Sequence, residues 1–291
     1  MTAITGLVLK NRKKNKKQEM GEICSIKSKD ISIVIPVKDN QGGINRILES
    51  VFESQELGHY PKEIIIVDNN EIMCTKIDRK FLGNGIEIKL FHCKTEGPGN
   101  ARNVGWKRAK GKWILFTDSD CIMTKASIQE YIKSDNGSIG YAGNVKAIEK
   151  GPLSGYYDSQ QILIPLQNEF KEPEYLITAN CLVYRQALEK INGFDPRIRI
   201  AAGEDVDLGI RLRNYGKLTY CKKAIIMHNF DESIDDFKKR FIRYGKGNKI
   251  VSNIYNIDLS PEPFAPIVKN PNNNYLSAMQ YHYLKKGYES S

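Results

Sequence analysis

Cysteine and histidine are sparse in this sequence and lack the spacings of a structural metal site or a disulfide framework. Six cysteines occur without a C-x-x-C pair, and none has a histidine partner at zinc-site spacing. The apolar runs are also far too short for a helix that crosses a bilayer. These absences exclude zinc-binding modules and disulfide-rich secreted domains. They favour a cytoplasmic protein with reduced, mostly buried thiols.

The familiar glycine-rich phosphate loops are missing as well. The segment 105–112 suggests a Walker motif at first sight, but its glycines are one residue too far apart and Trp113 stands where Ser or Thr is required. The segment 97–102 lacks the third glycine of a dinucleotide-binding fingerprint, and no G-x-S-x-G elbow occurs. These patterns argue against P-loop NTPases, Rossmann dehydrogenases and α/β-hydrolases.

Positive charge is concentrated near the start of the chain. The 291 residues carry a net charge of +10 with an ordinary hydrophobic fraction of 41%, and half of that charge lies in residues 1–30, centred on Lys10–Lys17. The apolar stretch precedes the basic one, which is the reverse of a secretory signal. We therefore expect a basic, disordered tail over residues 1–29. It is either merely solvated or attracted to an anionic membrane at the inner face of the cell.

From Asp30 onward the pattern becomes that of an α/β protein. Apolar runs predict strands over residues 31–37, 63–67, 86–91 and 112–117. After a predicted Gly42-Gly43 turn, apolar residues at helical spacing predict a helix around Ile44 and Val51, and a second helix is expected over residues 100–110. Alternating strands and helices favour a mostly parallel sheet that binds ligands at the carboxyl ends of its strands.

The triplet Asp118-Ser119-Asp120, the D-x-D motif, closes the fourth predicted strand. Alternate side chains of an extended segment point the same way, so both carboxylates can face one site. Oxygen ligands of this kind suit Mg²⁺ or Mn²⁺ shared with a phosphate. The alternative is an ordinary polar turn, since Asp and Ser are common turn residues.

Taken together, the motifs resemble those of family-2 glycosyltransferases with the GT-A fold, over residues 31–250. The resemblance rests on segments that follow one another in the family's order: Val34-Ile35-Pro36, Ile65-Ile66-Val67-Asp68, Gly99-Asn100-Ala101-Arg102-Asn103-Val104-Gly105, the D-x-D motif, Gly193-Phe194-Asp195 and Glu204-Asp205-Val206-Asp207-Leu208. The family's aromatic-Asn pair after the first strand is replaced by Lys38-Asp39-Asn40.

The resemblance implies a fold and a division of the chain. We expect a GT-A, Rossmann-like α/β domain over residues 30–258, with a mostly parallel central sheet flanked by helices. Its nucleotide-sugar half would cover residues 30–123 and its acceptor half residues 124–258. Residues 259–291 would form a C-terminal extension, for which the sequence indicates no role.

For the donor, the resemblance implies a UDP-sugar bound with Mn²⁺ or Mg²⁺. Asp120 would bind the metal directly, and Asp118 would act through water or the sugar ribose. Asp68 would accept a hydrogen bond from the uracil imide, unless it forms a turn with its own backbone. Arg102 would meet a phosphate or the base, unless it is an exposed helix arginine. Three further residues are assigned to the nucleotide site: Pro36, Val37 and Ser119.

For the acceptor, the resemblance implies a catalytic base at Asp205, which would remove the proton of the attacking hydroxyl. Glu204 would orient the acceptor or the base. The structural alternative is that these acids only favour a helix amino terminus, and for Asp207 we prefer a simple pair with Arg211 four residues on. His228, at the end of a predicted strand, would be a third metal ligand, unless it caps the following turn.

A helix is predicted over residues 235–249. Phe237, Phe241 and Tyr244 share one face, which favours core packing over a sugar platform. The basic side chains Arg240, Arg243 and Lys246 lie elsewhere on this helix and face either the diphosphate, a lipid-linked acceptor or water.

These expectations add up to an inverting glycosyltransferase. It would move a hexose or N-acetylhexosamine from a UDP-sugar to the hydroxyl of a glycan, lipid-linked or other acceptor, and surface glycan synthesis is one setting for it. A catalytically inactive nucleotide-sugar binder would require a broken acidic motif, and a sugar nucleotidyltransferase a Gly-rich loop with arginine after the first strand; neither is present. No nucleic-acid partner is expected, because aromatics do not interleave with the basic clusters.

Overall fold

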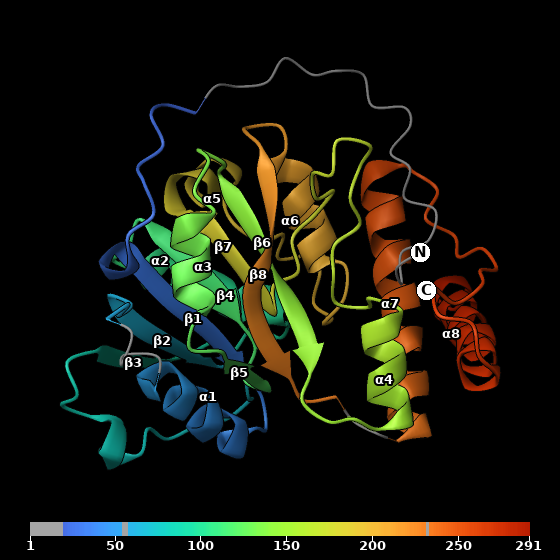
Figure 1. Ribbon diagram of the computed structural model, residues 1–291, viewed down its shortest axis with the longest axis horizontal. Coiled ribbons are helices and arrows are strands. Elements are labelled where there is room, and N and C mark those ends of the chain that lie inside the picture. Colours follow the sequence, from blue (N-terminus) through green and yellow to red (C-terminus); the bar gives the residue numbers. More distant parts are fainter. Residues whose placement is uncertain (1–19, 54–57, 231–232) are drawn as a thin grey trace.

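One mixed sheet forms the centre of the computed structural model, which describes residues 20–53, 58–230 and 233–291. Within these residues the sheet has eight strands in the order β3-β2-β1-β4-β7-β6-β8-β5 (Figure 1). The strands are β1 Ile31–Val37, β2 Glu63–Asp68, β3 Glu87–His92, β4 Trp113–Thr117, β5 Cys121–Met123, β6 Gly140–Ala147, β7 Asn180–Tyr184 and β8 Leu218–His228.

Helices lie on both sides of this sheet and form a separate layer at one end, on the right in Figure 1. The α-helices of the described residues are α1 Gln41–Glu53, α2 Pro98–Arg108, α3 Ser127–Lys133, α4 Pro152–Ser159, α5 Arg185–Ile191, α6 Glu204–Leu212, α7 Ile234–Tyr255 and α8 Pro271–Glu289. Two short 3-10 helices are η1 Ser28–Asp30 and η3 Arg79–Phe81.

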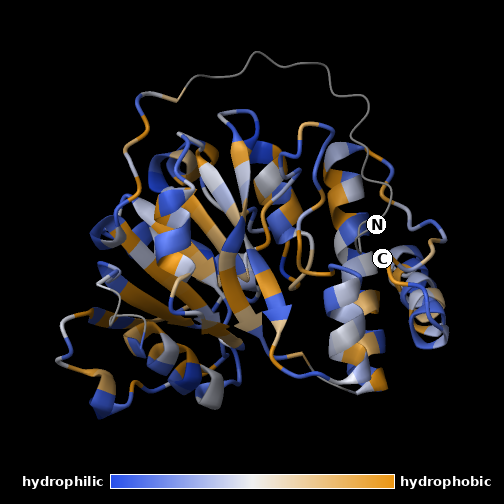
Figure 2. Cartoon of the chain, in the orientation of Figure 1, coloured by the Kyte–Doolittle hydropathy of each residue, from blue (hydrophilic) through white to orange (hydrophobic). Residues whose placement is uncertain are grey.

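The first half of the sheet is parallel, as the sequence predicts. β1 pairs in parallel with β2 on one side and β4 on the other, so that Val34 lies beside both Ile65 and Phe116. All three strands are buried along their whole length, which is why their central parts are apolar (Figure 2). The α/β fold class is confirmed. In the second half, however, β7 is antiparallel to β4 and β6, and β5 is antiparallel to β8.

The predicted Gly42-Gly43 turn is wrong, because both glycines lie inside α1, which begins at Gln41. Asn40 starts the helix early, since its Oδ1 accepts the Gly43 N–H at 3.0 Å. A Cβ at Gly43 would lie 2.1 Å from the Ser119 carbonyl oxygen. The glycine therefore permits close packing of α1 on the D-x-D motif, where Asn40 Nδ2 donates to Ser119 Oγ at 3.2 Å.

The sheet register brings the D-x-D motif next to the end of β8. β5 begins directly after Asp120 and pairs with β8, so that Cys121 lies beside His228. The backbone N–H of Asn229 also donates to the Asp120 carbonyl oxygen at 2.9 Å. Two residues more than a hundred positions apart in the chain are thus fixed in one place.

The layer at the end of the sheet consists of α4, α7 and α8 around an aromatic cluster. Phe237 and Phe241 of α7 are fully buried and pack on Tyr156 and Tyr157 of α4. Core packing is therefore confirmed for these two members of the predicted stripe. Tyr244 differs, because it is only partly buried and lines the cavity described below.

The C-terminal extension contains α8, which packs against α7. α8 also touches α4, and the two long helices lie in close contact at a pair of glycines. A Cβ on Gly287 would lie 2.0 Å from the Ile242 carbonyl oxygen, and one on Gly245 would lie 2.0 Å from that of Leu284. Among the helices of the described residues, none combines the length and apolar composition needed to cross a bilayer.

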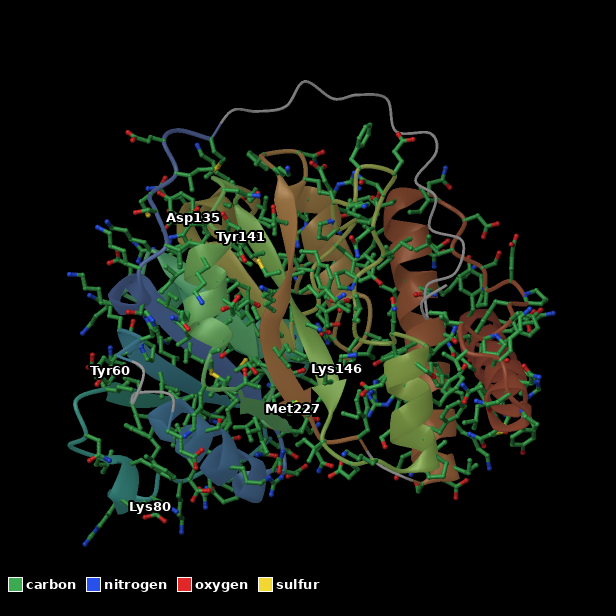
Figure 3. All side chains as sticks on the ribbon, in the orientation of Figure 1. Tyr60, Lys80, Asp135, Tyr141, Lys146 and Met227 are labelled. Atoms are coloured by element: carbon green, nitrogen blue, oxygen red, sulfur yellow. The ribbon has the colours of Figure 1, made fainter. Side chains whose placement is uncertain are left out.

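The segment before β1 is partly joined to the domain. Lys10–Lys17 lie outside the described residues, but Ile26 is buried and its N–H donates to Asp135 Oδ2 at 2.9 Å. Asp135 also accepts a hydrogen bond from the Tyr141 hydroxyl at 3.1 Å (Figure 3). The part of the predicted tail after residue 20 therefore packs against the folded domain, where the sequence alone indicated disorder.

Candidate active site

Both halves of the chain contribute to one cavity of about 710 Å³ at the carboxyl edge of the parallel strands. From the first half come Pro36 and Val37 at the end of β1, together with Asn69 and Arg102. The D-x-D motif lines the cavity where the two halves of the chain meet. From the second half come the start of α6, His228 and one side of α7. This position agrees with the general rule for ligand sites in open α/β sheets.

Within the D-x-D motif the two carboxylates differ in their surroundings. The side chain of Asp118 is 29% exposed and accepts a hydrogen bond from Arg102 Nη2 at 2.6 Å. The side chain of Asp120 is 41% exposed, and its Oδ2 lies 3.5 Å from His228 Nε2. Of the two, Asp120 is therefore the freer for a ligand in the cavity. Burial raises the pKa of Asp120, and the imidazole of His228 opposes that shift.

The residues around Asp120 suit a divalent cation. Ligand atoms of Asp120, Cys121 and His228 lie within 4.8 Å of one another, and adjacent ligands of an octahedral ion with bonds of about 2.1 Å are roughly 3 Å apart. The Nδ1 atom of His228 is buried without a hydrogen-bond partner in the described residues. Burial raises the pKa of the Cys121 thiol well above its usual value, which makes it a poor ligand. Asp120 and His228 are thus the donors that fit a divalent cation, and an imidazole beside a carboxylate suits Mn²⁺ better than Mg²⁺.

Arg102 joins the D-x-D motif to the acceptor block. Its guanidinium is almost fully buried and makes two ion pairs, to Asp118 at 2.6 Å and to Glu204 at 3.0 Å. Burial alone would lower the pKa of Arg102, but the two carboxylates raise it overall, so the group stays charged. The alternative of an exposed helix arginine is wrong. Because both terminal nitrogens hold carboxylates, the guanidinium connects α2, the end of β4 and α6.

Glu204 and Asp205 begin α6 side by side but have different environments. Glu204 is buried and held by Arg102, whereas Asp205 is half-buried, lines the cavity and accepts a hydrogen bond from the Val206 N–H at 2.8 Å. Burial, followed by repulsion from Glu204, raises the pKa of Asp205 to about 7. A carboxyl group that titrates in this range is suited to accept a proton near neutral pH.

Asp207 has a structural role, as the sequence favours. It is fully buried, pairs with Arg211 one helical turn later and accepts a hydrogen bond from the Tyr255 hydroxyl at 2.6 Å. Arg211 in turn donates to the Ile191 and Gly193 carbonyl oxygens. The pair thus lies in the interior and not on the helix surface, and it attaches α6 to α7 and to the end of α5.

Asp68 adopts the turn arrangement in this structure. Its carboxylate is fully buried and accepts hydrogen bonds from the backbone N–H groups of Asn70, Cys74 and Thr75 at 2.7–2.8 Å. Burial alone would raise the pKa of Asp68, but these hydrogen bonds lower it to about 2. Its neighbour Asn69 lines the cavity instead. The contact with uracil therefore stays a prediction without support from this geometry.

The α7 wall is a part of the cavity that the motifs did not reveal. This name denotes the α7 residues that line the cavity: Asp236, Lys239, Arg240, Arg243, Tyr244 and Asn248. Arg243 Nε donates to the Ala201 carbonyl oxygen at 3.1 Å, which brings this wall against the loop before Asp205. The sequence signal was the spacing of Arg240 and Arg243, but the spacing alone does not tell which face meets a ligand.

The comparison with a protein-family model decides the family. Residues 32–191, more than half of the chain, match the model of glycosyl transferase family 2. The chain belongs to this family. Among curated relatives, the pre-mycofactocin glycosyltransferase of Mycobacterium tuberculosis is 26% identical in an alignment of 228 positions, which covers 75% of this chain and 46% of the relative. The family 2 chain thus spans less than half the length of that protein.

TarS of Staphylococcus aureus, named as a poly(ribitol-phosphate) beta-N-acetylglucosaminyltransferase, is 30% identical over 105 residues, 34% of this chain and 18% of TarS. A crystal structure of TarS 1–349 with UDP matches with a TM-score of 0.53 at 18% identity, over 78% of this chain and 70% of that one. The mannosyltransferase PcManGT of Pyrobaculum calidifontis, in complex with GDP-Man and Mn²⁺, matches with a TM-score of 0.56 at 12% identity, over 90% and 73%. These similarities establish the GT-A-like fold of the family 2 chain.

Proposed function

We propose that this family 2 chain is a metal-dependent, inverting glycosyltransferase that transfers a hexose or N-acetylhexosamine from a UDP-sugar to an acceptor hydroxyl. The observation that carries the proposal is the arrangement of the D-x-D motif and Asp205 on one cavity, with Arg102 ion-paired to both blocks. The cavity of about 710 Å³ has the size of a ligand pocket. The UDP complex of TarS supports a UDP-sugar donor.

In this proposal Asp120 and His228 would hold Mn²⁺ or Mg²⁺. The ion would supply positive charge for the leaving diphosphate. Asp205 accepts the proton of the acceptor hydroxyl as its oxygen bonds to the anomeric carbon. Arg102 keeps Asp118 and Glu204 in place, so that the metal-binding turn and the base stay in fixed relation. Direct displacement by the acceptor inverts the anomeric configuration.

The setting we propose is the synthesis of a surface glycan. TarS is named for transfer to poly(ribitol-phosphate), and this name supports a polymeric acceptor for the present chain as well. A GDP-mannose complex among the structural neighbours means that the fold alone does not select the base. Donor identity is therefore the first property to measure.

The deciding test is UDP affinity by calorimetry with and without Mn²⁺. We expect Asp120→Ala to lose most of the metal-dependent affinity, because the diphosphate and the carboxylates repel each other when no cation lies between them. Asp258→Ala removes an exposed carboxyl outside the cavity and serves as the matched control. Unchanged metal-dependent binding in Asp120→Ala would remove this residue from the site.

Two further measurements on the same protein test the choice of nucleotide and distinguish an active transferase from an inactive binder. Thermal shifts with UDP, ADP and GDP should rank UDP first, and equal shifts would contradict a uridine-specific site. An active transferase should also release UDP slowly from its donor in the absence of acceptor. A catalytically inactive binder would bind UDP-sugar and leave it intact.

A further inference from the structure

We propose that Arg240 on the α7 wall binds the diphosphate of the donor and stabilises its charge as the sugar leaves. The inference rests on the proposed nucleotide-sugar donor, but it assigns a cationic subsite outside the motifs that the sequence reveals. Its ligand is a diphosphate group, as in a nucleoside diphosphate or inorganic pyrophosphate. The supporting observations are the packing, the charge and the position of this side chain.

Arg240 is held in place by residues from three separate segments. Its guanidinium carbon lies 5.4 Å from the ring centroid of Tyr157 on α4 and 5.3 Å from that of Phe230, which follows β8. Its Nη1 also lies 3.5 Å from the Tyr244 hydroxyl, one turn further along α7. Tyr157 and Phe230 stack on each other at 4.6 Å, so the aromatic support is itself rigid. A guanidinium fixed in this way loses little conformational entropy when it binds a ligand.

The charge of Arg240 has no carboxylate partner within ion-pair distance among the described residues, unlike its neighbours on α7. Lys238 and Lys239 pair with Asp235 and Asp236 at the exposed start of the helix. Burial alone would lower the pKa of Arg240, but the oxygens of Tyr244 and Tyr157 and the Asp120 carboxylate raise it overall. A charged, half-buried guanidinium that lines the cavity without an ion pair is suited to an anionic ligand.

The position of Arg240 points to the diphosphate and not to the acceptor. The Phe230 ring that supports Arg240 also contacts the His228 ring at 4.4 Å, and His228 lies 3.5 Å from Asp120. Arg240 therefore belongs to the same corner of the cavity as the candidate metal donors. Arg243, one turn later, turns instead toward the Ala201 carbonyl oxygen beside the acceptor block. A diphosphate carries enough charge for a cation on one side and a guanidinium on the other.

This placement gives Arg240 a role in the reaction. The bond between the anomeric carbon and the β-phosphate oxygen breaks, and its electron pair stays on the diphosphate. The acceptor oxygen forms the new bond, and its proton passes to Asp205. A donor group that is already in position stabilises such developing charge without reorganisation. Because arginine can offer two parallel N–H donors, lysine should replace it only in part.

The experiment measures binding of UDP and of inorganic pyrophosphate, both with saturating Mn²⁺, by calorimetry. We expect Arg240→Gln to weaken both by about tenfold to a hundredfold, the usual range for a charged hydrogen bond, and Arg240→Lys to fall between this variant and the unmodified protein. Lys246→Gln removes the same charge from an exposed position of α7 outside the cavity and should bind like the unmodified protein. Mn²⁺ binding measured by paramagnetic resonance should be equal in all of them.

The outcomes separate the two proposals. If the unmodified protein binds UDP and Arg240→Gln binds it equally well, the role of Arg240 is refuted while the proposed function stands. If the unmodified protein binds neither UDP nor pyrophosphate, both fail. A lower unfolding temperature of Arg240→Gln would indicate a structural role, and Arg240→Lys then decides the case: affinity equal to that of the unmodified protein in this folded variant would overturn the inference.

Discussion

At the scale of single residues, Asp205 shows how its surroundings prepare a carboxyl group for proton transfer. Burial and the neighbouring Glu204 raise its pKa to about 7, whereas hydrogen bonds from three backbone N–H groups lower the pKa of Asp68 to about 2. The two aspartates have the same chemistry and opposite roles. Asp68 holds its own loop in place, and Asp205 is the proposed proton acceptor at the cavity.

Asp205→Asn should therefore slow transfer by about 10²- to 10⁴-fold while UDP binding is retained, because only the proton acceptor is lost. In the unmodified enzyme the base acts when deprotonated, so kcat/KM should fall as pH decreases through about 7. Turnover measured across this pH range in both proteins checks the assignment. A loss of less than tenfold would mean that another group is the base.

The free energy of unfolding should depend on pH in the opposite sense to activity. A carboxyl whose pKa is raised by folding contributes stability below its unfolded pKa and loses that contribution as pH rises through the folded value, here about 7. The asparagine of Asp205→Asn cannot ionise. The unfolding temperature of this variant, relative to that of the unmodified protein, should therefore increase as pH rises. Thermal denaturation of the same two samples at acidic and alkaline pH measures this difference.

The residue scale also shows what the sequence can reveal about a site. D-x-D and the Glu204-Asp205 block are local patterns, and both lie on the cavity as predicted. The partner of Arg102 could not be predicted in the same way. A guanidinium meets a phosphate or a carboxylate with equal ease, and the choice of Glu204, 102 positions away, depends on the tertiary fold.

At the scale of elements, α7 depends on α8 for its position. The two helices approach so closely at Gly245 and Gly287 that a Cβ on Gly287 would lie 2.0 Å from the Ile242 carbonyl oxygen. The α7 wall lies on the same helix, so α8 packs directly behind the helix that carries Arg240 and Arg243. This is a role that composition and hydrophobic spacing did not indicate.

We expect Gly287→Ala to destabilise the protein by about 1–3 kcal/mol, the usual cost of overpacking a tight contact. Gly155→Ala on α4 is the control, because a Cβ there would meet nothing within 4 Å and Ala is the better helix former. Urea denaturation of both variants measures the difference. Equal stability of the two would show that α8 can shift without cost.

Elements were predictable where burial alone determines them. β1, β2 and β4 are buried over their whole length, and their ends were predicted within one residue. The glycines at the start of α1 were misassigned, because a Gly-Gly pair is typical of a turn and nothing local indicates that Ser119 lies against Gly43. Long-range contact, not propensity, decides such positions.

At the scale of the whole molecule, the charge distribution predicts contact with an anionic membrane. Six basic residues lie within Lys10–Lys17, outside the described residues, and each would gain roughly 1 kcal/mol near an anionic surface. Because Ile26 is buried against the domain, the truncation should remove only residues 1–19. We expect full-length protein to sediment with anionic liposomes at low salt and the truncated protein to remain in solution.

Transfer to a soluble acceptor should survive this truncation, since every proposed site residue follows Asp30. Liposomes of neutral lipid are the control for non-specific adhesion. If full-length and truncated proteins sediment equally, the segment is merely solvated.

The pairing of β5 with β8 has a consequence for folding as well as for ligand binding. β5 has only three residues and forms an outer edge of the sheet. A slip of one residue there would turn alternate side chains to the opposite face and separate His228 from Asp120. A cation held by these two residues would then act as a clasp for the sheet edge. Its binding should slow amide exchange in β5 and β8, so exchange at this edge of the sheet would report whether the donor site holds its cation.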